Sequence, residues 1–465
     1  MNHDFAIVIL AAGLGTRMKS RQAKVLHRAG GKTLIELVTS TAVRLVPPER
    51  VYVVIGHQGG LVRQVLDGSG VRFVEQTEQL GTGHAIASGR GCLDASGKRL
   101  LVLYGDCPLV TPGTLEALMR RHVESGAAAT VLTTTLENPS GYGRILRGSS
   151  GAVQAIVEEK AATPEQKSIR EINSGMYCFE TAPLFEALAA LRPDNPAKEY
   201  YLTDVIAGMV GRGLKVEACH TAESSEVLGI NTRVELAAVD AVLRSREVRR
   251  LMLEGVTIQK PETVIIDAGV SVGEDTVVEP FVQVLGRCRI AANCWIRAHS
   301  IISDSVLGEG VVVEPFSIIQ ESEVQRGARI GPFARLRAGN IVGAEARVGN
   351  FVELKKTAFG ARSKAMHLAY LGDAAVGADV NVGAGTITCN YDGTAKHPTV
   401  IDDGAFVGSN STLVAPLTLG DGSFVGAGSC ITKDVPEGAL AIGRARQITR
   451  EGWATSRRNA QCKQG

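Results

Sequence analysis

The strongest constraint on the fold is a six-residue repeat that fills the second half of the chain. Aliphatic residues recur every six positions from Ile266 to Ile302, and again from Ile401 to Ile431. A small residue often stands four positions after the aliphatic one, as at Cys288 and Ser300. Helices repeat every 3.6 residues and strands every 2, so neither explains a period of six. A hexapeptide β-helix does, because each hexad forms one face of a coil and points its aliphatic residue into a common core.

The repeat is not continuous. It shifts by one residue before Leu307 and breaks between Lys355 and Tyr370, in a stretch that contains His367. We interpret that stretch as an excursion from the scaffold, because loops held by a rigid scaffold often carry function. A His there can act as a general base, since its unperturbed pKa lies near neutral pH. Considered alone, His367 also fits a surface His without a role.

The first half follows a different pattern, in which apolar runs alternate with amphipathic segments. The segments 34–45 and 114–125 predict helices. Strands are predicted at Phe5–Leu10, Val51–Ile55, Leu100–Tyr104 and Ala129–Thr134. Buried strands that alternate with helices indicate an α/β domain with a mostly parallel sheet covered on both faces.

Three regions therefore follow one another along the chain. We expect an α/β domain at 1–231, a linker helix at 232–254 and a hexapeptide-repeat domain at 255–465. The last residues, 449–465, are polar and basic and predict a loosely held C-terminal arm.

Charge and cysteine content argue against several classes of protein. Lys and Arg number 50 against 48 acidic residues, so the net charge of +2 gives no general attraction to nucleic acid or to an anionic membrane. No run approaches the ~20 apolar residues of a membrane-spanning helix. Asp4 stands where a signal peptide would be basic. The nine scattered cysteines contain no Cys-x-x-Cys, which favours reduced thiols in a cytoplasmic protein.

A segment rich in small residues directly follows the first predicted strand and runs from Leu10 to Met18. Its backbone amides can approach a phosphate or a base closely, and Arg17 adds positive charge. It lacks the third Gly of the dinucleotide fingerprint and the Gly-Lys-Ser/Thr of a P-loop. Taken alone, it fits an ordinary strand-to-helix turn equally well.

Three further groups strengthen the case for a nucleotide site. Lys24 follows nine residues after Gly15, and a second small-residue loop at 81–85 comes after Gln76. Asp106 ends a predicted strand, where open α/β sheets place their ligands. A carboxylate among phosphate-binding loops suggests Mg²⁺, and a helix cap or turn is the alternative for this residue.

At this point the chain resembles a known family. Leu-Ala-Ala-Gly-x-Gly-Thr-Arg-Met with Lys24, Gln-Leu-Gly-Thr-Gly-His-Ala and Tyr-Gly-Asp are similar to the motifs of sugar-nucleotide pyrophosphorylases. With the hexapeptide half included, the resemblance from Ile7 to Trp453 is to the bifunctional N-acetylglucosamine-1-phosphate uridylyltransferase/glucosamine-1-phosphate N-acetyltransferase family. It implies a Rossmann-like nucleotidyltransferase domain followed by a left-handed parallel β-helix.

For the first domain, the resemblance implies a site for UTP and N-acetylglucosamine 1-phosphate, with Mg²⁺ held by Asp106 and Asn231. The matching positions are Leu10, Ala11, Ala12, Gly13, Arg17, Lys24, Gln76, Gly81, Thr82, Tyr104, Gly105, Asp106, Gly143, Glu158, Asn173 and Asn231.

For the second domain, the resemblance implies acetylation of glucosamine 1-phosphate by acetyl-CoA in a homotrimer, with His367 as the base and Glu353 orienting it. The sugar phosphate would contact Arg337, Lys355, Tyr370 and Asn381. Acetyl-CoA would contact Ala384, Asn390, Tyr391, Ser409, Ala427 and Arg444. No nucleic-acid partner and no membrane insertion are expected.

Two positions depart from the family pattern, and two other functions stay open. Gln22-Ala23 replaces Leu-Pro before Lys24, which removes the φ restriction of proline, and Gly443 replaces a Ser. One alternative is a single-activity sugar-1-phosphate nucleotidylyltransferase whose β-helix only oligomerises. The other is a scaffolding protein built on an inactive transferase.

Overall fold

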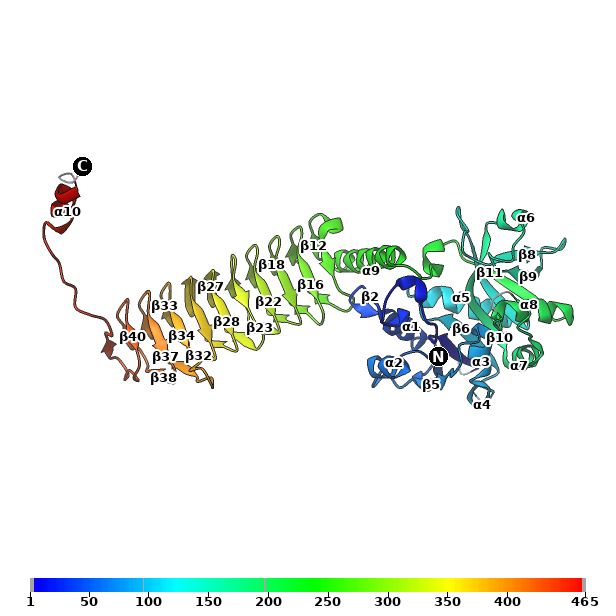
Figure 1. The fold of residues 1–465 in the computed structure, drawn as a ribbon, viewed down its shortest axis with the longest axis horizontal. Helices are drawn as coiled ribbons and strands as arrows, with labels where there is room; N and C mark the ends of the chain where they lie inside the picture. The colour runs from blue at the N-terminus through cyan, green and yellow to red at the C-terminus, as the bar shows by residue number, and fades with distance from the viewer. Residues whose placement is uncertain (1–3, 95, 196–197, 462–465) are drawn as a thin grey trace. The chain divides into compact units, whose positions relative to one another are not determined.

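The computed structural model describes residues 4–94, 96–195 and 198–461, and it divides the chain into two units, Met1–Arg246 and Glu247–Gly465 (Figure 1). The boundary falls inside one helix, α9 (Arg233–Leu253), which lies within the predicted range 232–254. No helix in the described ranges is long and apolar enough to cross a membrane.

The first unit is built on a mixed sheet with the strand order β11-β7-β10-β6-β1-β4-β5. Strand β1 pairs in parallel with both of its neighbours, whereas β10 runs antiparallel to β6 and β7. The four predicted strands are confirmed to within one residue. The strands are β1 (Phe5–Leu10), β4 (Val51–Ile55), β5 (Arg72–Glu75), β6 (Arg99–Tyr104), β7 (Ala129–Thr135), β10 (Glu171–Glu180) and β11 (Val216–His220). Strand β8 (Arg144–Arg147) pairs with β10, β9 (Val153–Val157) pairs with β8, and β2 (Arg28–Ala29) and β3 (Lys32–Thr33) form a separate pair.

Both faces of this sheet are buried, as the unbroken apolar runs predict. Alternate residues of β1 belong to two different cores, Phe5 and Ile7 to one and Ala6 and Val8 to the other. The first core is covered by α1 and α5, and the second by α3, α7 and α8. The helices are α1 (Leu34–Ala42), α2 (Gly59–Val65), α3 (Thr82–Ala87), α4 (Arg90–Leu93), α5 (Pro112–Ser125), α6 (Pro164–Lys167), α7 (Thr181–Ala190) and α8 (Leu202–Gly211).

The second unit is a parallel β-helix with three faces, each a parallel sheet of short strands. The first face is β12 (Thr257–Ile258), β15 (Val277–Val278), β18 (Trp295–Ile296), β21 (Val312–Val313), β24 (Arg329–Ile330), β27 (Arg347–Asn350), β30 (Lys364–His367), β33 (Asn381–Val382), β36 (Phe406–Val407), β39 (Phe424–Val425) and β41 (Leu440–Ala441). The second face is β13 (Ile265–Ile266), β16 (Gln283–Leu285), β19 (Ile301–Ser303), β22 (Ile318–Gln320), β25 (Arg335–Leu336), β28 (Glu353–Lys355), β31 (Tyr370–Gly372), β34 (Ile387–Cys389), β37 (Thr412–Val414) and β40 (Cys430–Ile431). The third face is β14 (Ser271–Val272), β17 (Arg289–Ile290), β20 (Val306–Leu307), β23 (Ser322–Val324), β26 (Asn340–Val342), β29 (Ala358–Phe359), β32 (Ala374–Val376), β35 (Thr399–Ile401) and β38 (Leu417–Leu419).

The aliphatic residues of the hexads lie in one continuous core, and the small residues four positions later are buried beside them, as at Cys288 and Ser300. Cys288 and Cys294 are buried there as free thiols, which confirms that they are stacked small residues. The other described cysteines are also free, and Cys462 lies outside the described residues.

The predicted excursion between Lys355 and Tyr370 is wrong. Phe359, Ala365 and Leu371 continue the buried column, and His367 ends strand β30. The repeat only looked broken because some coils take five residues instead of six between the second and third faces, as from Leu354 to Phe359.

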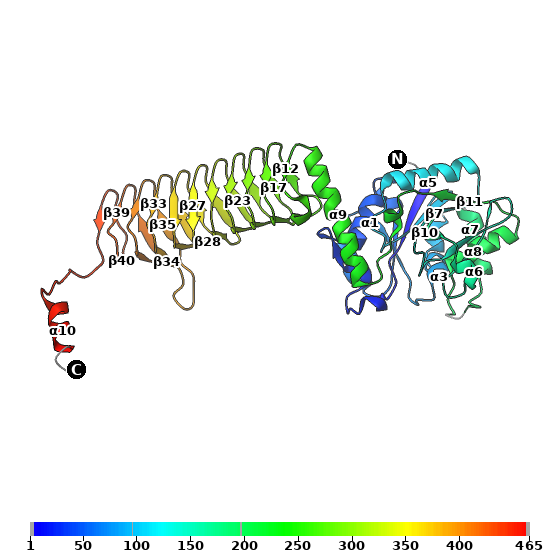
Figure 2. The same ribbon diagram turned by 90° about the horizontal axis from the view of Figure 1, so that it is seen from above.

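The real departure from the coil lies between β34 and β35. Residues 390–398 leave the stack there as a loop, which Figure 2 shows beside β34. The C-terminal arm contains one helix, α10 (Trp453–Gln461), and its side chains are exposed as far as Asn459.

Candidate active sites

Four polar side chains that lie far apart in the sequence meet in the first unit. The Lys24 ammonium is paired with the Asp106 carboxylate and donates to Asn231 Oδ1 at 3.2 Å. Arg17 Nη2 donates to the same oxygen at 2.8 Å. These predicted residues thus form one cluster of two cations and two oxygen-bearing groups, and Lys24 and Asp106 are both largely buried.

The backbone holds this cluster at the ends of two neighbouring strands. Gly105 N–H, which follows β6, donates to Leu10 O of β1 at 3.0 Å, and Ile230 N–H donates to Asp106 O at 3.0 Å. Gly15 has φ +63°, and a Cβ there would lie 2.7 Å from Lys24 Cβ, so only glycine lets the loop pass this closely. A Cβ at Gly13 would meet nothing within 4 Å, so this part of the backbone faces open space where a ligand can approach.

Three other residues predicted for the first site, Gln76, Gly81 and Thr82, lie on or next to the second loop. Gln76 is buried, and its Nε2 donates to Gly81 O and contacts His84 Nδ1, both at 3.1 Å. Gly81 has φ +107°, and a Cβ there would lie 2.7 Å from Tyr200 O. Thr82 Oγ1 accepts from Leu202 N–H at 3.0 Å. Gln76 also lines a hollow of about 480 Å³ together with Gly56, His57 and Gln79.

Glu158, another residue predicted for the first site, lies near Tyr104. Burial raises the pKa of the Tyr104 hydroxyl, and the Glu158 and Asp106 carboxylates raise it further. Burial also raises the pKa of Glu158, whose Oε1 accepts from Thr203 at 3.2 Å. Both groups are therefore biased toward their neutral forms, which can donate hydrogen bonds to hydroxyl groups of a sugar.

Gly143 and Asn173, two further residues predicted for the first site, are joined by a backbone hydrogen bond. Asn173 N–H donates to Gly143 O at 2.9 Å, and Asn173 Nδ2 donates to Tyr177 Oη at 2.7 Å. Gly143, which precedes β8, and Asn173 in β10 are thus held against each other.

In the second unit, His367 lies at the corner between the first and second faces of the β-helix. It stands two positions after the core residue of its coil, and Ala384, Ser409 and Ala427 stand at the same position of the next three coils. Backbone bonds connect these coils at the corner, for example Asn410 N–H to Ala384 O at 2.7 Å. We call this row the site corner. Arg444 follows β41, the last strand of the first face.

The next position along the same corner changes character where the site begins. A column of five aromatic rings, with neighbouring centroids 4.8–5.4 Å apart, occupies it in the preceding coils, and the last ring is Phe351. Leu368, Gly385, Asn410 and Gly428 follow in the coils of the site. This position therefore carries no ring in the coils of the site. The ring residues are Phe281, His299, Phe316, Phe333 and Phe351.

The predicted sugar-phosphate residues lie on the two adjoining faces. Asn381 lies on the first face beside Lys364, and Tyr370 pairs with Glu353 on the second. The Glu353 carboxylate accepts from Arg337 Nη1 at 3.2 Å, so its partner in the structure is this arginine. Its predicted role of orienting His367 stays a prediction.

Asp373 and Lys396 are two residues that the sequence reasoning missed. Asp373 accepts a hydrogen bond from Asn390 and lies 3.9 Å from Lys355 Nζ, so it joins two predicted residues. Lys396 lies on the 390–398 loop against Lys355, and this second ammonium lowers the pKa of Lys396. The interruption of the repeat before Ile401 could have pointed to Lys396, whereas nothing in the sequence distinguishes Asp373.

Asn390 and Tyr391 lie one corner away from His367 within a single chain, at the end of β34. The loop that follows is fastened by Asp392, which accepts from Ala395 N–H at 2.7 Å and from His397 Nε2 at 2.7 Å. These hydrogen bonds hold the pKa of Asp392 well below its usual range.

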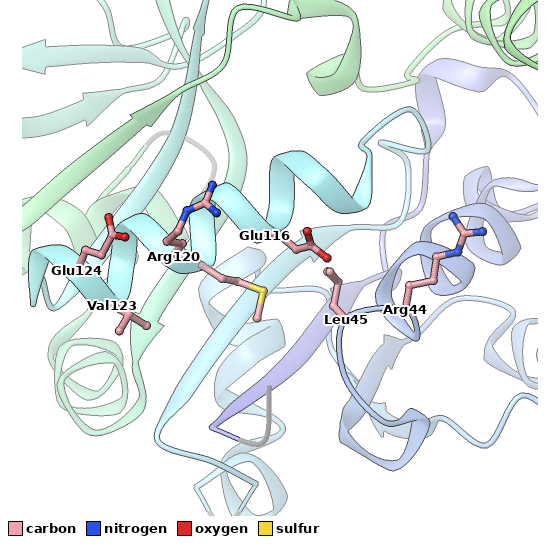
Figure 3. Close-up of a pocket in the computed structure, with 7 residues that line it drawn as sticks. Arg44, Leu45, Glu116, Arg120, Val123 and Glu124 are labelled. Atoms are coloured by element: carbon pink, nitrogen blue, oxygen red, sulfur yellow. The ribbon is translucent and has the colours of Figure 1, made fainter. Parts of the chain in front are cut away.

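A separate hollow of about 430 Å³ lies against α5 and the end of α1, and Figure 3 shows its lining. Glu116 and Arg120 project from α5, and Arg44 approaches from the other side. None of the residues predicted for either site lines this hollow.

Comparisons with known proteins agree with both halves of this description. Residues 7–204 match the MobA-like NTP transferase domain family. The chain is 52% identical to the bifunctional protein GlmU of Koribacter versatilis over 99% of both chains. It is also 52% identical to that of Solibacter usitatus over 98% of both, and 45% identical to that of Pelobacter propionicus over 97% of this chain and 98% of the relative. Because these relatives match across both units, the chain belongs to the family of the bifunctional GlmU proteins, the uridylyltransferase/acetyltransferase family that its motifs resemble.

Proposed function

We propose that the chain catalyses two successive reactions, one in each unit. The second unit acetylates glucosamine 1-phosphate with acetyl-CoA. The first unit then transfers UMP from UTP to the N-acetylglucosamine 1-phosphate, which gives UDP-N-acetylglucosamine and pyrophosphate. The observation that carries this proposal is that each unit has its own cluster of predicted residues, around Lys24 in one and along the site corner in the other.

In uridylyl transfer, a phosphate oxygen of the sugar attacks the α-phosphorus of UTP and pyrophosphate leaves. Such a reaction needs in-line positioning and neutralised charge more than a protein nucleophile. Arg17 and Lys24 supply positive charge beside the open backbone at Gly13. Once phosphates arrive, they compete with Asp106 and Asn231 for these two cations.

Asp106 and Asn231 are the residues that would hold Mg²⁺. The fit rests on their chemistry, because a carboxylate and an amide oxygen are hard donors of the kind that Mg²⁺ prefers. In the structure both oxygens already face one cation, the Lys24 ammonium. When bound, Mg²⁺ supplies further neutralisation of phosphate charge.

In acetyl transfer, the amine of glucosamine 1-phosphate attacks the thioester carbonyl of acetyl-CoA. His367 takes the proton that the nitrogen must lose, and the CoA sulfur leaves as the new amide bond forms. The imidazole is exposed at the corner where the rings end, so the amine can reach it. A β-helix that served only for oligomerisation would have no need of this change in the corner.

We propose that the chain acts as a homotrimer through its β-helix, in the cytoplasm. Asn390 and Tyr391 lie one corner away from His367 in a single chain. A neighbouring copy could bring its own Asn390 and Tyr391 to the site corner, which would complete the acetyl-CoA site.

One set of assays tests the whole proposal. Purified protein is supplied with UTP and N-acetylglucosamine 1-phosphate, or with acetyl-CoA and glucosamine 1-phosphate, and its mass is measured by sedimentation. We expect both products and a trimer. Uridylyl transfer without acetyl transfer would support the single-activity alternative, and loss of both would support a scaffolding role.

A further inference from the structure

We propose that Gln58 is a positioning residue for uridylyl transfer, because its carboxamide holds the loop that carries Arg17 and Lys24. The proposal rests on the proposed function of the first unit. Gln58 lies outside the predicted site, directly before α2, and it reaches the loop with its side chain alone.

Both ends of the Gln58 carboxamide are used, and each meets a backbone group of the loop. Oε1 accepts from Ala23 N–H at 2.8 Å, and Nε2 donates to Arg21 O at 2.7 Å. The two partners fix the orientation of the amide, since an N–H must face the oxygen and a carbonyl must face the NH₂. A carboxylate in the same place could satisfy Ala23 but would repel the Arg21 carbonyl.

The backbone conformation at Gln58 indicates that its side chain makes stabilising interactions. Gln58 has φ +57°, a conformation that side chains disfavour and that glycine adopts freely. A non-glycine residue in this region costs free energy, and the surrounding structure must compensate for it. The two hydrogen bonds to the loop are the compensation that the structure shows.

These two hydrogen bonds from Gln58 to the loop, here called the Gln58 clamp, also explain how the loop keeps its shape without a proline before Lys24. Ala23 is buried and has φ −57°, which is within the range that proline fixes. Proline has no N–H, so it could not donate to Gln58. A proline at position 23 and a glutamine at position 58 are therefore two alternative ways to restrain the same backbone.

Because Gln58 restrains the backbone at Ala23, it also restrains the two cationic side chains of the loop, Lys24 and Arg17. Ala23 precedes Lys24, whose ammonium meets Asp106 and Asn231. Lys24 Cβ in turn packs against the backbone at Gly15, two residues before Arg17. A loop that is free to shift at Ala23 would therefore displace both cations from the phosphates.

A double-mutant cycle tests this proposal in the full-length protein. Gln58→Gly removes the clamp and relieves the backbone at the same time, so misfolding is not expected. We expect kcat for uridylyl transfer to fall by about 10- to 100-fold, the usual cost of a displaced catalytic group. The melting temperature and acetyl transfer should stay near their wild-type values. Gln58→Glu should lie between wild type and Gln58→Gly.

The decisive measurement is whether Ala23→Pro restores kcat for uridylyl transfer. In the Gln58→Gly background it should restore most of the lost kcat, because proline restrains φ at position 23 by itself. Normal kcat in Gln58→Gly would overturn the proposal, as would a loss of kcat that Ala23→Pro does not restore. Absence of uridylyl transfer in the wild-type protein would instead overturn the proposed function, which the same assay measures first.

Discussion

At Lys24, a single ammonium group connects two oxygens that are the expected ligands of Mg²⁺. Asp106 is paired with it, and Asn231 accepts from it at 3.2 Å. The lysine therefore neutralises this pair in the structure, and we expect it to become available when phosphates and the proposed Mg²⁺ bind. Removal of the carboxylate should disturb charge balance in the first unit alone.

Asp106→Ala should lower uridylyl transfer by at least ~100-fold, because the phosphate charge is then poorly neutralised. Acetyl transfer should not change, since it takes place in the other unit. Both rates are measured on one preparation over a range of Mg²⁺ concentrations. Equal losses in both reactions would mean that the variant is misfolded or that the two activities share a site.

His367→Ala should lower acetyl transfer by ~10²–10⁴-fold, the usual contribution of a positioned base. Binding of acetyl-CoA should change little, because the proposed coenzyme residues lie in other coils. Uridylyl transfer in the same sample serves as the control. Near-normal acetyl transfer, measured where chemistry limits the rate, would assign the base to another group.

His122 gives the first unit a dependence of stability on pH. Burial lowers its pKa to about 4 from 6.5, and Nδ1 contacts Thr130 Oγ1 at 2.9 Å. The unfolded chain then binds a proton that the folded unit excludes, so the free energy of unfolding falls as pH drops from 6.5 to 4. We expect a loss of roughly 2–3 kcal/mol in urea titrations. His122→Gln should flatten this slope, and an unchanged slope would contradict the assignment.

At the scale of the element, the side chains in the row of the site corner set how much room the proposed acetyl-CoA site has. Ala384→Phe would place a ring on the site corner, and Ala298→Phe would place one at the equivalent position of a coil far from His367. Both alanines are partly exposed, so both variants should fold. We expect KM for acetyl-CoA to rise at least about tenfold in the first variant and not in the second. Equal effects in the two variants would argue against the placement of the coenzyme.

The elements also show what the sequence could predict. Strand β1 was predictable to the residue, because six consecutive apolar residues leave little choice. The coil containing His367 was mistaken for an excursion, because a five-residue step between two faces disturbs a strict count of six. The contact of Gln58 with Ala23 depends on a positive φ and on tertiary packing, and no local pattern encodes either.

At the scale of the whole molecule, the two activities should be separable. Arg246, near the middle of α9, donates to Leu109 O in the first unit, whereas Leu251 is buried in the core of the β-helix. A chain that ends at Arg250 should keep uridylyl transfer at close to the wild-type rate and lack acetyl transfer. Circular dichroism would check that it is folded. A folded but wholly inactive fragment would contradict this division of the two activities.

Along the site corner, the positions of the side chains are separated by the fixed spacing between coils of the β-helix. Neighbouring strands of a sheet lie ~4.8 Å apart, so the three steps from His367 to Ala427 span roughly 14 Å along the axis. In the proposed acetyl-CoA site, the distance between the base and the far end of the coenzyme is therefore a whole number of coils. In the same proposed complex, a coenzyme with a shorter or longer arm would place its thioester out of register with the imidazole.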